Sequence, residues 1–301
     1  MIYPEDLSIF NFSTVKINGV SGYSVSLKTN TTMPSYVIYP YIYDDKPVLE
    51  ITGSSSYNST YQSVITEIYI PETVVKIGDY AFKYFGIEQI DIPNVTSLGN
   101  NCFTDCSSLT TISLPKVTSL GFACFSYCYN LTTVDIPLVT SLGDNCFKSC
   151  ESLTTIDLPL VTKVGSYCFI RCESLLIIDL PKVTSLGTEC FYNCSSLIMI
   201  DLPLVTSLGS SCFSSCSSLT TIDLPKVTSL GSSCFNGCSK LAQFTLGEVS
   251  SPITNTSSFS TSSLNTYITT LNIYVEDASN PPTLTGSPWG ATNATIYYKQ
   301  A

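Results

Sequence analysis

A single motif, repeated along the middle of the chain, constrains the fold more than any other feature of the sequence. In its most regular form the motif reads P-x-V-T-S-L-G-x-x-C-F-x-x-C-x-x-L-x-x-I-D-L, and it begins again at the next proline. Seven copies follow one another between Pro93 and Cys238, and their prolines are spaced 22 residues apart. One such unit is too small to bury its own apolar face, so successive copies must stack on one another. The sequence therefore predicts an elongated array.

Within one copy, the spacing of the apolar residues changes from helical to extended. Cys146, Phe147, Cys150 and Leu153 have the spacing of one helical or 3-10 face turned inward. From Leu153 to Leu158 apolar and polar residues alternate, which indicates a short strand with one buried side. A proline ends this strand, and a second extended piece and a glycine turn lead back to the helical turn. We therefore predict an α/β repeat protein, a right-handed solenoid with 22-residue coils and a parallel β-sheet along one face.

The sequence changes at both ends of the regular array. Residues 1–64 are rich in tyrosine and contain strand-like runs, and we predict that they form an N-terminal β cap and the first strand. Residues 65–246 are predicted to hold about eight coils, seven of them with the C-F-x-x-C motif. Residues 247–301 are predicted to form degenerate repeats and a C-terminal cap, with TTLNIYV and ATIYY as strands. Caps are expected because the terminal layers of core side chains would otherwise face water.

Composition argues against several classes of function. The chain contains no histidine, which removes the commonest general base and makes a Ser-His-Asp or Cys-His catalytic site impossible. Its net charge of −10 argues against nucleic-acid binding through a basic patch. No apolar run approaches the roughly 20 residues of a membrane span. We therefore predict a non-enzymatic protein with no cofactor, no nucleic-acid partner and no membrane span.

One copy of the repeat lacks cysteine, and it carries a resemblance to a known family. Residues 70–82 read IPETVVKIGDYAF, and later copies supply the second half of the pattern as CSSLTTIDLP. Together they resemble the BspA-type leucine-rich repeats of bacterial surface proteins, over about residues 44–246. There are two departures: most copies are one residue shorter than the usual repeat of that family, and cysteine replaces its alanine before phenylalanine.

The resemblance implies a leucine-rich-repeat solenoid that acts as a surface-exposed or secreted binding or adhesion protein. The expected partner is a protein or a glycan, bound on the face of the sheet. An alternative is a structural or host-recognition component, for example a spacer in a phage particle or a surface layer. Location at the cell surface or secretion is likewise implied only by the resemblance. Met1–Phe12 has no basic start and no apolar core, so a leader has been removed or the chain is made without one.

Fourteen cysteines form seven C-F-x-x-C pairs on the predicted inward face. Three interpretations are open: buried thiols that act as small apolar side chains, a disulfide within each pair, or metal sites. The first is favoured because Ala81 and Phe85 replace the cysteines in the imperfect copy, which a ligand role does not permit. So short a loop would also gain little stability from a disulfide. The predicted core cysteines are Cys102, Cys106, Cys124, Cys128, Cys146, Cys150, Cys168, Cys172, Cys190, Cys194, Cys212, Cys216, Cys234 and Cys238.

A row of aspartates is the second regular feature of the array. Alternation along the strand places these side chains on the outward side of the sheet. They could be a solvated surface, a face for cations or basic ligands, or a carboxylate pair for glycoside hydrolysis. The last is disfavoured because a regular row offers no pair of unlike carboxyl environments. The aspartates of this candidate binding face are Asp135, Asp157, Asp179, Asp201 and Asp223.

Two adjacent copies interrupt the polar character of the same face. Where most copies carry Thr-Thr before the middle of the strand, one copy has Leu176 and Ile177, and the next has Ile198 and Met199. An exposed apolar patch of this kind can mark a contact site, although neutral drift in a duplicated array would leave the same trace. We predict that these four residues, the apolar quartet, form a surface for a partner or for weak self-association.

Overall fold

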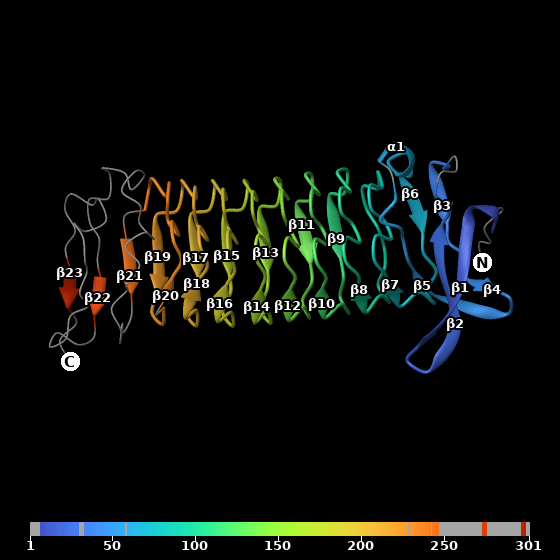
Figure 1. The fold of residues 1–301 in the computed structure, drawn as a ribbon, viewed down its shortest axis with the longest axis horizontal. Coiled ribbons are helices and arrows are strands. Elements are labelled where there is room, and N and C mark those ends of the chain that lie inside the picture. The colour runs from blue at the N-terminus through green and yellow to red at the C-terminus, as the bar shows by residue number, and fades with distance from the viewer. Residues whose placement is uncertain are drawn as a thin grey trace.

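An elongated stack of coils forms most of the molecule (Figure 1). The computed structural model describes residues 7–29, 33–57, 59–227, 229–241, 243–246, 273–275 and 296–298. The coils follow one another along the long axis, and strands of the N-terminal region lie at one end of the stack (Figure 1). Parallel strands recur at the 22-residue period of the sequence. The predicted solenoid is therefore confirmed.

The predicted strands form a ladder of parallel pairs along one side of the stack, the first ladder. Its hydrogen-bonded pairing is interrupted once, between its second and third strands. In the five three-residue strands, the central residue is buried and its neighbours face outward. The strands are β9 (Thr111–Ser113), β11 (Thr133–Asp135), β13 (Thr155–Asp157), β15 (Ile177–Asp179), β17 (Met199–Asp201), β19 (Thr221–Leu224) and β21 (Gln243–Leu246).

A second ladder of parallel strands runs beside the first, built from the second extended piece of each coil (Figure 1). The sequence predicted only one sheet, because two-residue strands are too short to show an alternating pattern. The strands of this second ladder are β10 (Ser119–Leu120), β12 (Ser141–Leu142), β14 (Lys163–Val164), β16 (Ser185–Leu186), β18 (Ser207–Leu208) and β20 (Ser229–Leu230).

Stacked phenylalanine rings form the centre of the core. From Phe103 to Phe235, each ring lies parallel to the next within 8°. Their centroids are 5.2–5.5 Å apart, an offset stack that aromatic rings favour. Each of these rings is completely buried. The phenylalanine that follows the first cysteine of each copy therefore joins all the regular coils into a single continuous core.

The segment that holds each cysteine pair contains hydrogen-bonded turns, and the prediction of a helical turn there is wrong. Asn145 and Ser149 have φ values of +59° and +56°, outside the range of a right-handed helix. The N–H of Cys150 donates to the carbonyl of Phe147 at 3.1 Å within the coil. The N–H of Phe147 donates to the carbonyl of Cys168 in the next coil at 2.8 Å. This backbone thus bonds across coils, whereas a helix bonds along its own axis.

An antiparallel hairpin covers the N-terminal end of the stack. It pairs β1 (Phe10–Ile17) with β2 (Val20–Leu27) through a turn in which Asn18 and Gly19 both have positive φ, as two-residue hairpin turns require. Strand β2 then pairs in parallel with β5, β5 with β7, and β7 with β8. The other elements of this region are η1 (Leu7–Ile9), β3 (Tyr36–Ile38), β4 (Ile42–Tyr43), β5 (Lys46–Ile51), α1 (Ser59–Gln62), β6 (Glu67–Tyr69), β7 (Lys76–Ile77) and β8 (Ser97–Leu98).

The predicted C-terminal cap lies largely outside the described residues. Within it, β22 (Ile273–Val275) and β23 (Ile296–Tyr298) are described and pair in parallel. These strands fall in the two runs that the sequence indicated. The domain boundaries at residues 64 and 246 stay predictions.

Candidate functional site

The outward side of the first ladder holds the predicted aspartates. Asp157, Asp179, Asp201 and Asp223 pair in register on four consecutive strands and form a continuous row. Asp135 lies on β11, which pairs only with β9, so the interruption of the first ladder separates it from the other four. All five side chains are exposed. The structure therefore brings four of the five into one row.

This row has a concentrated negative charge. None of its aspartates forms an ion pair within the described ranges, where the ion pairs lie elsewhere. Partial burial, followed by the neighbouring charge of Asp201, raises the pKa of the Asp223 carboxyl. Between β9 and β11, the Ser113 hydroxyl donates to the Asp135 carboxylate at 2.7 Å. Carboxylates about 5 Å apart repel by about 1 kcal/mol in water, so the row favours cationic groups that approach it.

The apolar quartet lies beside this row, on and just before two adjacent strands. Ile177 on β15 pairs with Met199 on β17, and Leu176 and Ile198 precede them in the chain. Their exposed fractions lie between 41% and 47%. The four residues therefore form one exposed patch on an otherwise polar ladder. Its role as a contact surface stays a prediction.

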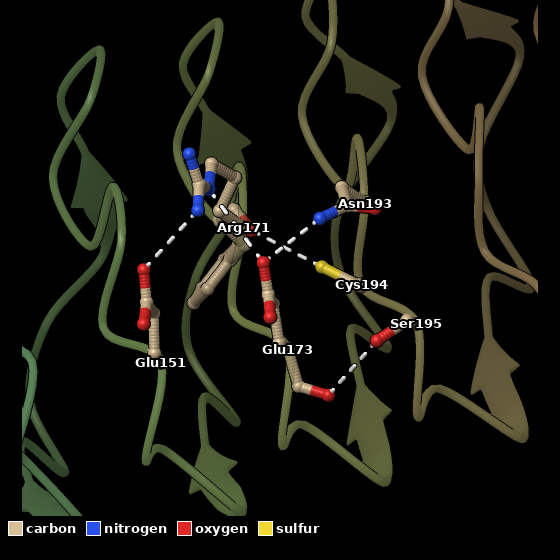
Figure 2. A network of polar contacts seen from close by, with 7 residues as sticks. Glu151, Arg171, Glu173, Asn193, Cys194 and Ser195 are labelled. Carbon is tan, nitrogen blue, oxygen red and sulfur yellow. Dashed lines mark hydrogen bonds and ion pairs between the residues drawn. The ribbon is translucent and has the colours of Figure 1, made fainter.

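A charged network lies in the turns that lead into β13, β15 and β17 (Figure 2). Arg171, the only arginine of the chain, places Nη2 3.5 Å from Glu151 Oε1 and Nε 3.6 Å from Glu173 Oε1. The side-chain amide of Asn193 donates to the same oxygen of Glu173 at 2.9 Å. The network thus links three successive coils. The sequence analysis missed this network. A signal was present, since glutamate follows the second cysteine in only two of the seven copies.

A groove at the N-terminal end of the same face was also missed. Residues 89–91 form no strand, so β9, the first strand of the ladder, does not pair with β6. The resulting groove has a volume of about 370 Å³. Of the predicted site residues, Asp135 lines it. Its lining residues are Ile68, Gln89, Ile90, Asp91, Thr111, Ile112, Ser113, Thr133 and Asp135.

The fourteen cysteines are free thiols buried in the core. The second thiol of each pair donates a hydrogen bond of 3.0–3.2 Å to a phenylalanine carbonyl of an earlier coil, as Cys172 does to Phe147. Sequence reasoning missed these bonds, which a purely apolar side chain could not make. Burial raises the pKa of the Cys172 thiol well above its ordinary range. A protonated, buried thiol is a poor nucleophile, so these side chains suit the core better than catalysis.

We expect the thiols to be protected from alkylation in the folded chain, because the thiolate is the reactive form and burial disfavours it. Iodoacetamide should leave the native protein unmodified. In denaturant without reductant, intact-mass measurement should show fourteen alkylations. Fewer than fourteen under those conditions would show disulfides and contradict the prediction.

The described part of the chain holds neither a metal-binding cluster nor a membrane-spanning helix. No group of three or more cysteine, aspartate or glutamate side chains is arranged to hold a metal ion there. None of the helices in those ranges has the length and apolar character to cross a membrane.

The chain is similar to known repeat proteins over most of its length. A family model described as a BspA type leucine rich repeat region matches residues 53–176 and 162–277, with six copies. A crystal structure of a T. pallidum leucine-rich repeat protein is 22% identical, covering 71% of this chain and 89% of its own, with a TM-score of 0.50, and shows likeness of fold alone. A leucine-rich cell surface protein of Faecalibacterium prausnitzii A2-165 is 20% identical, covering 100% and 96%, with a TM-score of 0.45.

A leucine-rich repeat protein of Bacteroides ovatus ATCC 8483 is 18% identical, covering 98% of this chain and 99% of its own, with a TM-score of 0.45. No curated protein matches the chain. The family model nevertheless matches well over half of the residues. The chain therefore belongs to the BspA-type leucine-rich repeat family.

Proposed function

We propose that the chain is a non-enzymatic, surface-exposed or secreted binding or adhesion protein. It uses the outward face of the first ladder to contact a protein or a glycan. The observation that carries the proposal is the exposed apolar quartet beside a row of aspartates that form no ion pair in the described residues. An array that served only as a spacer would need no such departure from the repeat. Family membership supports the proposed location, by resemblance.

The face has the physical properties of a binding surface. Apolar side chains removed from water contribute about 25 cal/mol for each Å² that is buried. Aspartates around them steer an oppositely charged partner and fix its orientation. The stacked phenylalanines hold the strands in one arrangement, so little conformational freedom is lost on binding.

A catalytic role has little chemical support. The chain has no histidine, and the aspartates of the row occupy equivalent positions on successive strands. General acid–base catalysis by two carboxyl groups needs two unlike environments. The regular row does not supply them.

A binding screen tests the proposal. We expect the full chain to bind at least one ligand among immobilised extracellular-matrix proteins and a glycan array, with and without calcium. Asp179→Asn combined with Asp201→Asn should weaken that binding by about threefold to tenfold, because it removes two charges from the face. The control is Asp44→Asn with Asp45→Asn, an equal charge change on an exposed turn of the N-terminal region. No ligand, or equal effects of the two double variants, would reject the proposal.

A structural or host-recognition spacer is the second candidate. Parallel ring stacking from Phe103 to Phe235 favours it, because it makes the array rigid along its length. If the array is a spacer, the caps carry the binding. Deletion of residues 203–224, one complete coil outside the quartet, should then leave binding intact. In that case substitutions on the sheet face should also have no effect on binding.

A further inference from the structure

Two adjacent coils cannot make a hydrogen bond that three other coils make at the same position. Thr110, Thr132 and Thr220 precede their strands, and their hydroxyls donate to a carbonyl of the previous coil at 3.1, 3.0 and 3.4 Å. Leu176 and Ile198 occupy this position and keep only the backbone bond to the previous coil, 3.0 Å in both cases. These coils therefore exchange a hydroxyl hydrogen bond for an exposed apolar side chain. Stability of the fold does not explain that exchange.

The apolar side chains of the two coils meet. Ile177 and Met199 are directly paired across β15 and β17, with Leu176 and Ile198 beside them. Neighbouring strands lie about 4.8 Å apart, so the quartet presents one patch to an approaching molecule. Because all four side chains are more than two-fifths exposed, covering them would remove apolar surface from water.

Charged groups lie at both edges of the quartet. Asp179 and Asp201 follow it on the same two strands. Arg171 lies on the preceding side, where Glu151 and Glu173 both contact it, so one positive charge faces two negative ones (Figure 2). These charged residues form the rim of the quartet, and the rim is negative on both sides. An apolar centre inside a polar rim is the usual anatomy of a protein–protein interface.

The charge of the rim discriminates between occupants. A second copy would bring the same negative rim against itself, and each chain carries a net charge of −10. A neutral glycan would leave the rim carboxylates without positive partners. A polypeptide with apolar side chains next to lysine or arginine satisfies both the centre and the rim.

We propose that the apolar quartet is the docking site for a protein partner that presents apolar side chains flanked by lysine or arginine. The inference rests on the proposed function and names its partner class. The partner's apolar side chains cover the quartet, and its basic groups contact Asp179 and Asp201. The Arg171 network holds the turns before the two strands in place, since it joins three coils.

The test uses the full chain and three synthetic peptides of equal length. The peptides alternate leucine with lysine, leucine with glutamate, or serine with lysine, and binding is followed by fluorescence anisotropy. The leucine–lysine peptide should bind the unmodified chain more tightly than either other peptide. A quadruple variant, Leu176→Thr, Ile177→Thr, Ile198→Thr and Met199→Thr, restores the Thr pair of the other copies. It should weaken binding by about tenfold or more, as removal of interface hot spots does.

Two controls separate docking from folding and from general charge attraction. The quadruple variant should melt at the same temperature as the unmodified chain or higher, because threonine can make the missing hydroxyl bonds. Asp179→Asn with Asp201→Asn should weaken binding several-fold at low salt and less at high salt. Asp44→Asn with Asp45→Asn should leave the affinity nearly unchanged.

Several outcomes would overturn the inference. One is that the leucine–lysine peptide binds the unmodified chain and the quadruple variant with equal affinity. Another is that the unmodified chain binds the serine–lysine peptide as tightly as the leucine–lysine peptide. Sedimentation in which only the unmodified chain self-associates would show that a second copy covers the quartet. If the ligand from the screen depends on the aspartates but not on the quartet, this docking site fails while the proposed function stands. If no change on the face affects any ligand, the proposed function fails.

Discussion

Raising the pH from about 8 to about 10 is expected to unfold the repeat array steeply. Burial raises the pKa of thirteen thiols above the ordinary value of 9.0. Above pH 9 the unfolded chain releases these protons while the folded chain retains them. The free energy of unfolding therefore has its full value below about pH 9 and falls as the pH rises toward the folded-state pKa.

The size of this effect follows from the number of thiols. Each contributes about 1.4 kcal/mol per pH unit above its unfolded pKa. At about pH 10, the twelve thiols whose pKa is raised furthest together remove on the order of 17 kcal/mol, more than the roughly 5–15 kcal/mol that stabilises an ordinary domain. Guanidinium titrations followed by circular dichroism at a series of pH values measure the slope.

A matched variant isolates the thiols from other alkaline effects. Alanine occupies the first cysteine position in the imperfect copy, as Ala81, and is completely buried there. Cys168→Ala with Cys190→Ala should therefore fold, and it should reduce the slope by about 1.4 kcal/mol per pH unit for each thiol removed. A free energy of unfolding that stays constant to about pH 10 would contradict the account of the core as protonated thiols.

Replacing Phe169 by alanine is expected to lower the free energy of unfolding by about 3–5 kcal/mol. The ring is completely buried and stacks between Phe147 and Phe191, with centroids 5.4 and 5.2 Å away. Both neighbours are themselves held in parallel stacks, so they cannot tilt to fill the cavity without losing other contacts. Coils contact mainly their immediate neighbours, so the loss should be greatest around the substituted coil.

Chemical denaturation measures the total loss, and hydrogen–deuterium exchange locates it. Exchange should accelerate most in β13, β15 and β17. Phe122→Ala is the matched control, because Phe122 is 48% exposed and should contribute less than about 0.5 kcal/mol. Similar losses for both variants would show that the ring stack does not carry the stability of the array.

The period of the sequence predicts most of the fold because the coils are nearly identical. A constant spacing of 22 residues forces Thr155 to align with Ile177 and Ile177 with Met199, as the structure confirms. Alternation then separates outward Asp157 from buried Ile156. The turn that holds the cysteines could not be predicted in this way. Its apolar spacing fits a helix, but residues with positive φ interrupt it, and apolar spacing carries no information on the sign of φ.

The candidate site could be predicted where it depends on one position of the repeat. It could not be predicted where it depends on contacts between different positions in neighbouring coils. Exposure of Ile177 and Met199 follows from alternation alone. The ion pair of Arg171 with Glu151 joins residues 20 positions apart, and the thiol bond of Cys172 to Phe147 joins residues 25 apart. Such contacts run diagonally across neighbouring coils. They depend on side-chain direction, which the 22-residue period does not contain.

The proposed binding site lies where the sequence departs from the repeat. Leu176 and Ile198 are such departures, because threonine at the same position makes a hydrogen bond in three other coils. Arg171 and Glu173 depart from the repeat in the coil of Leu176 and Ile177, and Glu151 departs from it in the coil before. Both departures border β15 and β17.

Hydrogen–deuterium exchange of the full chain, with and without the leucine–lysine peptide, tests the role of this face most directly. A binding surface at the quartet predicts protection in residues 173–179 and 195–201, with little change in the second ladder. The quadruple threonine variant should lose that protection while its free-state exchange stays unchanged. Protection confined to the N-terminal hairpin or to the second ladder would contradict the assignment of the first ladder as the binding face.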